Sequence, residues 1–173
     1  MQNIIQKILP NTPSEVISIW LAPIADTHGW PPTQDNDWRY VLGKDRNLEY
    51  LQSLKWSLDE IELKPDLIVP YDRQIVIDLF RSHVLKKTTV YSMVMSNGLE
   101  RFQNSCDYLK REGILPKPII LEQLGKQFHI FDGYHRVTAF FYLSGYFNIS
   151  NEHAPCLKVQ ANQKAWIAKK IDL

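Results

Sequence analysis

A short segment in the C-terminal half of the chain constrains the fold more than any other feature. Ile119–Leu121 and Phe128–Phe131 are β-rich runs on either side of a turn at Gly125, a pattern typical of a β-hairpin. The second run ends in Asp132-Gly133, and the apolar residues from Val137 to Leu143 follow almost at once. The sequence therefore predicts two paired strands and a sharp turn directly into a helix.

The composition is that of a globular chain. With 173 residues, 45% of them hydrophobic and 23% charged, the chain can build one domain with a sizeable core. Twenty Lys and Arg against nineteen Asp and Glu produce no overall field that would gather DNA or a membrane surface. We recognise no signal peptide and no apolar run near the roughly 20 residues that cross a bilayer. We therefore expect a cytoplasmic protein without a membrane partner.

The N-terminal third of the chain is predicted to be helical. Thr12-Pro13-Ser14-Glu15 is typical of a helix start, and apolar residues recur at helical spacing over 38–42 and 48–54. The Gly- and Pro-rich stretch between these segments suits an irregular loop. We therefore expect a helical extension over residues 1–57. Its core is expected to include the tryptophans Trp20, Trp30, Trp38 and Trp56.

The rest of the chain, residues 58–173, is predicted to form an α+β domain with a small mixed β-sheet and packed helices. Two short β-rich runs at its start, from Leu58 to Leu63 and from Leu67 to Val69, predict a strand or two. Asp72 is typical of a cap for the helix that follows, and the segment from Leu99 to Gly113 has the clearest helical pattern. Cys156–Val159 predicts a further strand, and Gln163–Lys170 a terminal helix.

The turn Asp132–Arg136 has the chemistry of a phosphate-binding site. A strand that leads directly into a helix leaves backbone N–H groups unpaired, and the helix dipole adds partial positive charge there. Gly133 lets the backbone approach a ligand, while His135 and Arg136 can donate to phosphate oxygens. The alternative is an ordinary Asp-Gly turn beside a solvated arginine. Our hypothesis is that this turn holds the phosphates of a nucleotide.

Neighbouring side chains are candidates for the same site. Lys117 precedes the first hairpin strand and could reach a phosphate, while Thr138 could add a hydroxyl or back-bond within its helix. Asp132 could orient its neighbours or accept a proton, although an Asp before Gly is often only turn chemistry. Glu60 and Glu62 could act as a general base or hold Mg²⁺, or they could be solvated strand charges.

Two other sets of residues have side chains that could form metal or thiol sites. Cys106 and Cys156 lack the paired spacing of a zinc site, so we expect small core residues. A run of metal-capable side chains without recognised ligand spacing lies in the N-terminal loop: Asp26, His28, Asp35 and Asp37. We expect no metal site made by the protein alone.

The order of these features resembles the ParB/sulfiredoxin superfamily. A helix ends in Arg111-Glu112-Gly113, a Pro-Ile strand and a hairpin follow, and Gly133-Tyr134-His135-Arg136 stands where the family has a G-x-x-R turn. Ala139 occupies the small position in the next helix. The resemblance covers roughly 61–160 and leaves the N-terminal extension outside.

The resemblance implies a ParB/sulfiredoxin-like fold that binds ATP or CTP, with Mg²⁺, through Gly133, Tyr134, His135 and Arg136. Members of the superfamily are CTP switches, a sulfinic-acid reductase, kinases of free serine and proposed nucleases, so the fold does not settle the reaction. Tyr134 stands where sulfiredoxins have their catalytic cysteine, so reductase activity is not expected. Only residues 160–173 follow Val159, so we do not expect the helix-turn-helix DNA-binding domain of the partition proteins.

Two classes of function remain open. The first is a small phosphotransferase or nucleotide hydrolase, for which the catalytic candidates are Asp132, His135 and Glu62. The second is a non-enzymatic module whose change of shape on binding nucleotide alters its contacts with a protein or a nucleic acid. The sequence does not choose the base, the acceptor or the partner.

Overall fold

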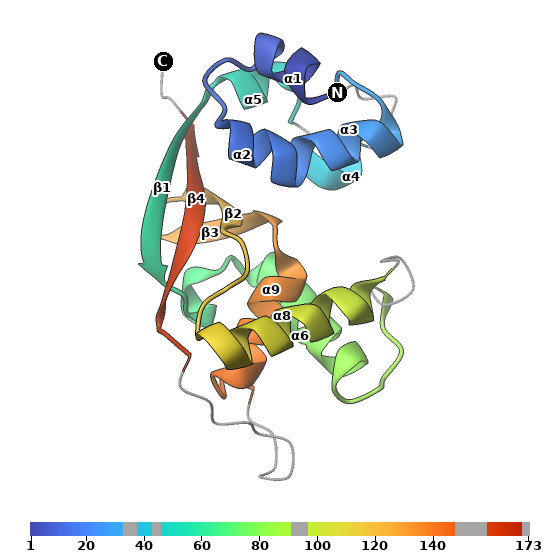
Figure 1. Cartoon of the computed structure of the whole chain (residues 1–173), viewed down its shortest axis with the longest axis vertical. Helices are drawn as coiled ribbons and strands as arrows, with labels where there is room; N and C mark the ends of the chain where they lie inside the picture. Colours follow the sequence, from blue (N-terminus) through green and yellow to red (C-terminus); the bar gives the residue numbers. More distant parts are fainter. Residues whose placement is uncertain (33–37, 43–45, 91–96, 148–158, 171–173) are drawn as a thin grey trace.

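The chain has a mixed α+β fold, as predicted, with helices on both sides of one sheet (Figure 1). The structure is a computed structural model that describes residues 1–32, 38–42, 46–90, 97–147 and 159–170. The N-terminal elements are α1 (Gln2–Ile8), α2 (Ser14–Val16), the π-helical turn η1 (Ile17–Leu21), α3 (Ala22–His28), α4 (Trp38–Leu42) and α5 (Leu48–Gln52). The later elements are β1 (Leu54–Glu62), the 3₁₀ turn η2 (Pro65–Leu67), α6 (Pro70–His83), α8 (Gly98–Glu112), β2 (Ile119–Leu124), β3 (Gln127–Asp132), α9 (Tyr134–Leu143) and β4 (Asn162–Lys170).

The four strands form one small mixed sheet in the order β1-β4-β2-β3. β1 runs antiparallel to β4, β4 runs parallel to β2, and β2 pairs with β3 as the antiparallel hairpin that the sequence predicts. The strand predicted over 67–69 is reduced to one bridge, between Ile68 and Phe128. β3 is therefore an edge strand, and the segment before α6 runs along its outer side.

The prediction of a terminal helix over Gln163–Lys170 is wrong, because these residues lie in β4. β4 is an inner strand, and both of its faces are covered. Ala165 and Ile167 pack in the core on one side, while Ala168 packs in the core on the other. A strand covered on both faces loses the alternation of polar and apolar residues that marks a strand. The strand predicted over Cys156–Val159 lies largely outside the described residues.

The sheet separates two hydrophobic cores. In β2, Ile119 and Leu121 pack against α6, α8 and α9, whereas Ile120 between them packs against the N-terminal helices. This is the period of two expected of a strand. Figure 1 shows the N-terminal helices as one group and α6, α8 and α9 as another. β1 begins at Leu54, so the chain enters the sheet within the segment assigned to the N-terminal extension.

The helices α6, α8 and α9, which pack on one face of the sheet, lie where the sequence predicts helices. α8 ends at Glu112 and is capped by Gly113, whose φ of 74° and N–H bond to the carbonyl of Leu109 fit the predicted C-terminal stop. Cys106 is buried in α8, and burial raises the pKa of its thiol to about 12. Contrary to the prediction, Asp72 does not cap α6. Pro70 sets the start of that helix after Val69, and Asp72 is fully buried in the first turn.

The predicted tryptophan core is also present in the N-terminal layer. Trp20 and Trp38 are buried, and Trp20 stacks on Phe131 of β3 with ring centroids 4.7 Å apart. In the described ranges, no helix is long and apolar enough to span a membrane.

Candidate functional site

The site is built on the predicted turn between β3 and α9. β3 ends at Asp132, Gly133 has a φ of 111°, and α9 begins at Tyr134. A Cβ atom at Gly133 would lie 2.9 Å from Cγ2 of Ile119. Two features therefore require glycine at this position. The backbone conformation is one that other residues rarely adopt, and β2 lies too close for a side chain.

Arg136 folds back over this turn. Its guanidinium donates to Oδ2 of Asp132 at 2.6 Å. A Cβ atom at Gly133 would lie 3.0 Å from Nη2 of Arg136. The Arg136 side chain is only 15% exposed, and its Nε is buried without a hydrogen-bond partner. A buried donor without a partner is costly. The arginine therefore carries positive charge at the turn with hydrogen-bonding capacity left over.

The N-terminus of α9 has further donors. No side chain caps it, and its first helical bond runs from the N–H of Val137 to the carbonyl of Gly133. Within the described ranges, the backbone N–H groups of His135 and Arg136 have no acceptor. Free N–H groups at a positive helix end form an anion-binding arrangement.

His135 lies beside this helix end but is not a cationic donor. It is buried, and its Nδ1 is 3.3 Å from Nε2 of His83 at the end of α6. Burial lowers the pKa of His135 to about 4, with smaller contributions from the charges of Arg101 and Arg136 and from His83 when it is protonated. Burial also lowers the pKa of His83. At neutral pH both rings are therefore uncharged.

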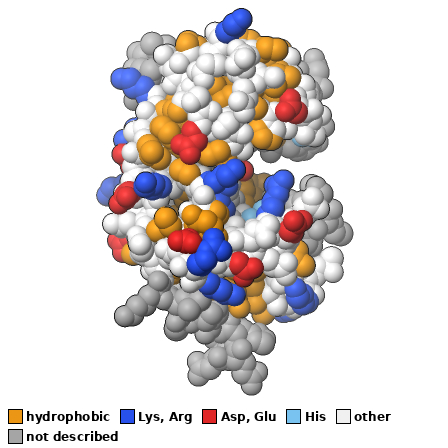
Figure 2. Space-filling view, viewed as in Figure 1, with side chains coloured by type: hydrophobic (Ala, Val, Ile, Leu, Met, Phe, Trp, Pro, Cys, Tyr) orange, Lys and Arg blue, Asp and Glu red, His pale blue; other side chains and the backbone are white. Residues whose placement is uncertain are grey.

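The N-terminus of α8 meets the same histidine. A Cβ atom at Gly98, the first residue of α8, would lie 2.9 Å from Cε1 of His135. Two helix N-termini thus adjoin this ring. The space-filling view shows a hollow between the N-terminal helices and the lower group of helices, with basic and histidine side chains beside it (Figure 2).

Tyr134 is anchored rather than open to a ligand. Its hydroxyl donates to Oδ1 of Asp72 at 2.7 Å, and Oδ2 of the same carboxylate accepts from the backbone N–H of Ile130 and from Nδ1 of His129, each at 2.7 Å. Sequence reasoning missed Asp72 and His129. The signal for Asp72 was its place at helical spacing with the buried residues Ile75, Val76, Leu79, Phe80 and His83.

Two other predicted residues belong to the same end of the sheet. Thr138 is fully buried and donates to the carbonyl of Tyr134 at 2.8 Å, which is the back-bonding alternative. Lys117 is exposed and lies two residues before β2. Because Ile120 pairs with Asp132, Lys117 is at the end of the sheet that carries the turn.

The structure does not bring Glu60 and Glu62 to the turn. Both lie on β1, and the sheet order places β4 and β2 between β1 and β3. Three strand spacings amount to about 14 Å. Glu62 is 52% exposed and pairs with Lys64 at 2.8 Å. Of the predicted carboxylates, Asp132 alone is part of the turn.

The described residues offer no preformed site for a metal ion. They contain no group of three or more His, Cys, Asp and Glu side chains with suitable geometry, and the carboxylate of Asp132 is engaged by Arg136. Of the metal-capable N-terminal run, Asp35 and Asp37 lie outside the described residues. Among the described residues, the Mg²⁺ expected with a nucleotide is therefore not matched by a protein ligand set.

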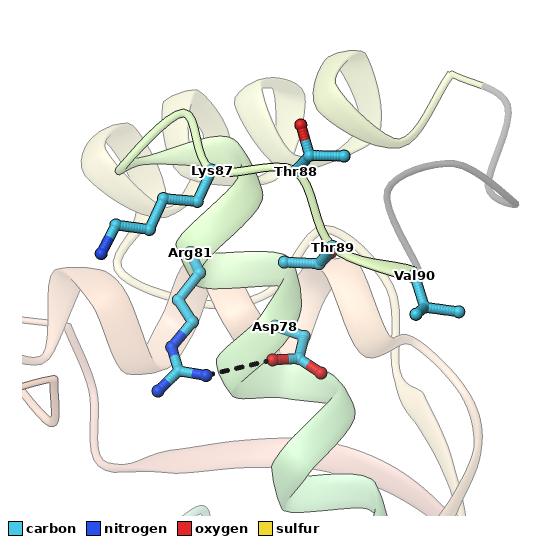
Figure 3. A pocket seen from close by; sticks show the side chains of 6 residues that line it. All are labelled: Asp78, Arg81, Lys87, Thr88, Thr89 and Val90. Atoms are coloured by element: carbon cyan, nitrogen blue, oxygen red, sulfur yellow. Dashed lines mark hydrogen bonds and ion pairs between the residues drawn. The ribbon is translucent and has the colours of Figure 1, made fainter.

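A second hollow, of about 550 Å³, is lined by residues of α6 and of the segment that follows it. Figure 3 shows it between α6, where Arg81 pairs with Asp78 at 3.4 Å, and the segment Lys87–Val90. None of the residues predicted from the sequence as a site lines it.

No protein-family model, curated protein or solved structure matches this chain. The case for a function therefore depends on the geometry of the turn.

Proposed function

We propose that the protein binds a nucleoside triphosphate, ATP or CTP, with its phosphates at the turn Gly133–Arg136. The observation that carries the proposal is the uncapped N-terminus of α9 beside Arg136, whose buried Nε has no partner. Backbone N–H groups, a helix dipole and a guanidinium together match the charge and the acceptors of a phosphate. The proposal includes a ParB/sulfiredoxin-like character for the C-terminal domain.

Within this proposal Arg136 changes partner. In this structure Arg136 donates to Asp132, which keeps the guanidinium at the turn. A phosphate can take the unused donor of Arg136 and the free N–H groups of α9, while Asp132 turns toward solvent, to which it is already partly exposed. His135, being neutral, contributes at most one N–H and no charge.

A panel of ATP, CTP, GTP and UTP in a thermal-shift assay, with and without Mg²⁺, tests the proposal. A nucleotide at 100 times its dissociation constant should raise the unfolding free energy by about 2.7 kcal/mol. Absence of a shift with every nucleotide would refute nucleotide binding.

Arg136→Ala should weaken the affinity by about 1.5–3 kcal/mol, the range for a hydrogen bond to a charged group. Arg81→Ala is the matched control, because Arg81, like Arg136, pairs with an aspartate a few residues before it in the sequence, but it lies outside the turn. Equal affinity in wild type and Arg136→Ala would remove Arg136 from the site.

One observation favours a nucleotide-dependent interaction module as the second candidate. Phe131, the residue before Asp132, stacks on Trp20 in the N-terminal layer. A shift of the turn on binding would move this stack and alter the surface of the N-terminal helices. Nucleotide-dependent tryptophan fluorescence that disappears in Phe131→Leu, without any turnover, is the expected result for such a module.

A further inference from the structure

His129 and Asp72 form a hydrogen-bonded pair beside the turn. The Asp72 carboxylate, fully buried in α6, accepts from Nδ1 of His129 at 2.7 Å. A carboxylate can only accept, so the bond places the ring proton on Nδ1 and the lone pair on Nε2. This is the arrangement in which a carboxylate orients a histidine that acts as a general base.

The second nitrogen of His129 is available. The side chain is 17% exposed, and within the described ranges Nε2 has no hydrogen-bond partner. The groups that face the ring are Asp72 from α6, Phe131 from β3, and Glu122 from β2, which forms an ion pair with Arg46. The ring therefore stands beside two carboxylates and one guanidinium, and the charge of Arg46 compensates that of Glu122.

The other candidate bases near the turn are occupied. Asp132 is held by Arg136. His135 is buried against His83, and Glu62 lies on the opposite edge strand in a pair with Lys64. Within the described part of the chain, His129 is the titratable side chain near the turn that combines an orienting carboxylate with a free nitrogen.

The pair is also joined to the turn. Asp72 contacts both His129 and the hydroxyl of Tyr134, the residue after Gly133. Along β3, His129 precedes Asp132 by three residues, or about 10 Å. A triphosphate that begins at the turn and extends along this edge brings its terminal phosphate toward His129.

We propose that the His129–Asp72 pair is the general base of a phosphoryl-transfer or hydrolysis reaction, acting on the hydroxyl of water or of an alcohol. The inference rests on the proposed nucleotide binding. The hydroxyl oxygen bonds to the terminal phosphorus while its proton passes to Nε2 of His129. The bond from that phosphorus to the bridging oxygen breaks, and the nucleoside diphosphate leaves with the electron pair. Asp72 keeps Nδ1 protonated and stabilises the imidazolium.

The test measures nucleoside diphosphate release from ATP and CTP, with water alone and with glycerol as an alcohol probe. His129→Gln should lower turnover at least about a hundredfold, as loss of a general base does, with nucleotide affinity unchanged. The control is His28→Gln, which replaces a histidine in α3 and should leave turnover unchanged. Imidazole in solution should restore turnover to His129→Gly but not to Arg136→Ala.

The possible failures are distinguishable. Calorimetry that detects no nucleotide binding to the wild type overturns the proposed function and this inference with it. Binding without turnover, or turnover that His129→Gln leaves intact, overturns the base and leaves nucleotide binding standing. Nitrogen-15 spectra of the wild type supply a check that needs no variant to fold. They should show the Nδ1-protonated tautomer of His129, and the opposite tautomer would overturn the assignment.

Discussion

Acidification should destabilise the protein through His135. Its pKa is lowered from 6.5 to about 4 in the folded chain, whereas in the unfolded chain the ring returns to its ordinary value. Between these values the unfolded state binds more protons than the folded state. The unfolding free energy therefore falls as the pH falls from about 6.5 toward 4, and the contribution is complete above 6.5.

The magnitude follows from the pKa difference. Each pKa unit corresponds to about 1.4 kcal/mol, so a fall from 6.5 to about 4 amounts to about 3 kcal/mol for this one group. The neighbours act in the same direction, because His83, Arg101 and Arg136 all carry positive charge when protonated and disfavour a second charge on the ring. In a protein with 5–15 kcal/mol of stability, such a loss is easily measured.

The assay is urea unfolding at a series of pH values for wild type and His135→Gln. Wild type should lose about 3 kcal/mol more than the variant between about pH 6.5 and pH 4. His28→Gln serves as the control and should follow the wild type. Parallel losses in wild type and His135→Gln would refute the reasoning, as would a proton resonance of His135 that titrates near the ordinary value.

Three further substitutions test the packing of the site. Gly133→Ala should lower the unfolding free energy by at least about 1–2 kcal/mol, since a residue with a Cβ is strained at this φ and meets β2; an unchanged urea midpoint would contradict this. Tyr134→Phe should cost about 1.5–3 kcal/mol, because it removes a donor from the buried carboxylate of Asp72; thermal unfolding measures the loss, and Tyr146→Phe, at an exposed tyrosine, is the control. Arg46→Ala should cost about 3 kcal/mol by leaving Glu122 buried without its partner, and restoration of the stability by Glu122→Gln in the same chain would support that cause.

The sequence predicted those parts of the fold whose signals are local. The hairpin, the turn at Gly133 and the helix that ends at Gly113 each carry their turn residues and their apolar spacing within a few positions. β4 was predicted as a helix because its pairing partners, β1 and β2, are distant in sequence. Between two covered faces, its apolar residues Ala165, Trp166, Ile167 and Ala168 show no alternation.

The residues of the candidate site also fall into two groups, those that a local motif indicates and those that meet only through the fold. Arg136 and Gly133 could be predicted because a short motif shows a helix start and a flexible turn. Asp72 and His129 could not, since they meet across 57 residues of chain and each is unremarkable alone. An aspartate after a proline suggests a helix cap, and a histidine between Phe128 and Ile130 suggests a half-buried strand position.

Asp72 makes the site depend on α6 as much as on the motif. Its carboxylate receives donors from β3, through His129 and Ile130, and from α9, through Tyr134. The backbone N–H of Ile130 is on the outer edge of β3, beyond the single bridge between Ile68 and Phe128, so the carboxylate also satisfies a donor of this edge. One buried anion with three donors fixes the position of the helix, the tautomer of the histidine and the direction of the tyrosine together. The hairpin, turn and helix α9 alone would leave His129 without the carboxylate of Asp72, so a fragment that retains the proposed site must extend back to Pro70.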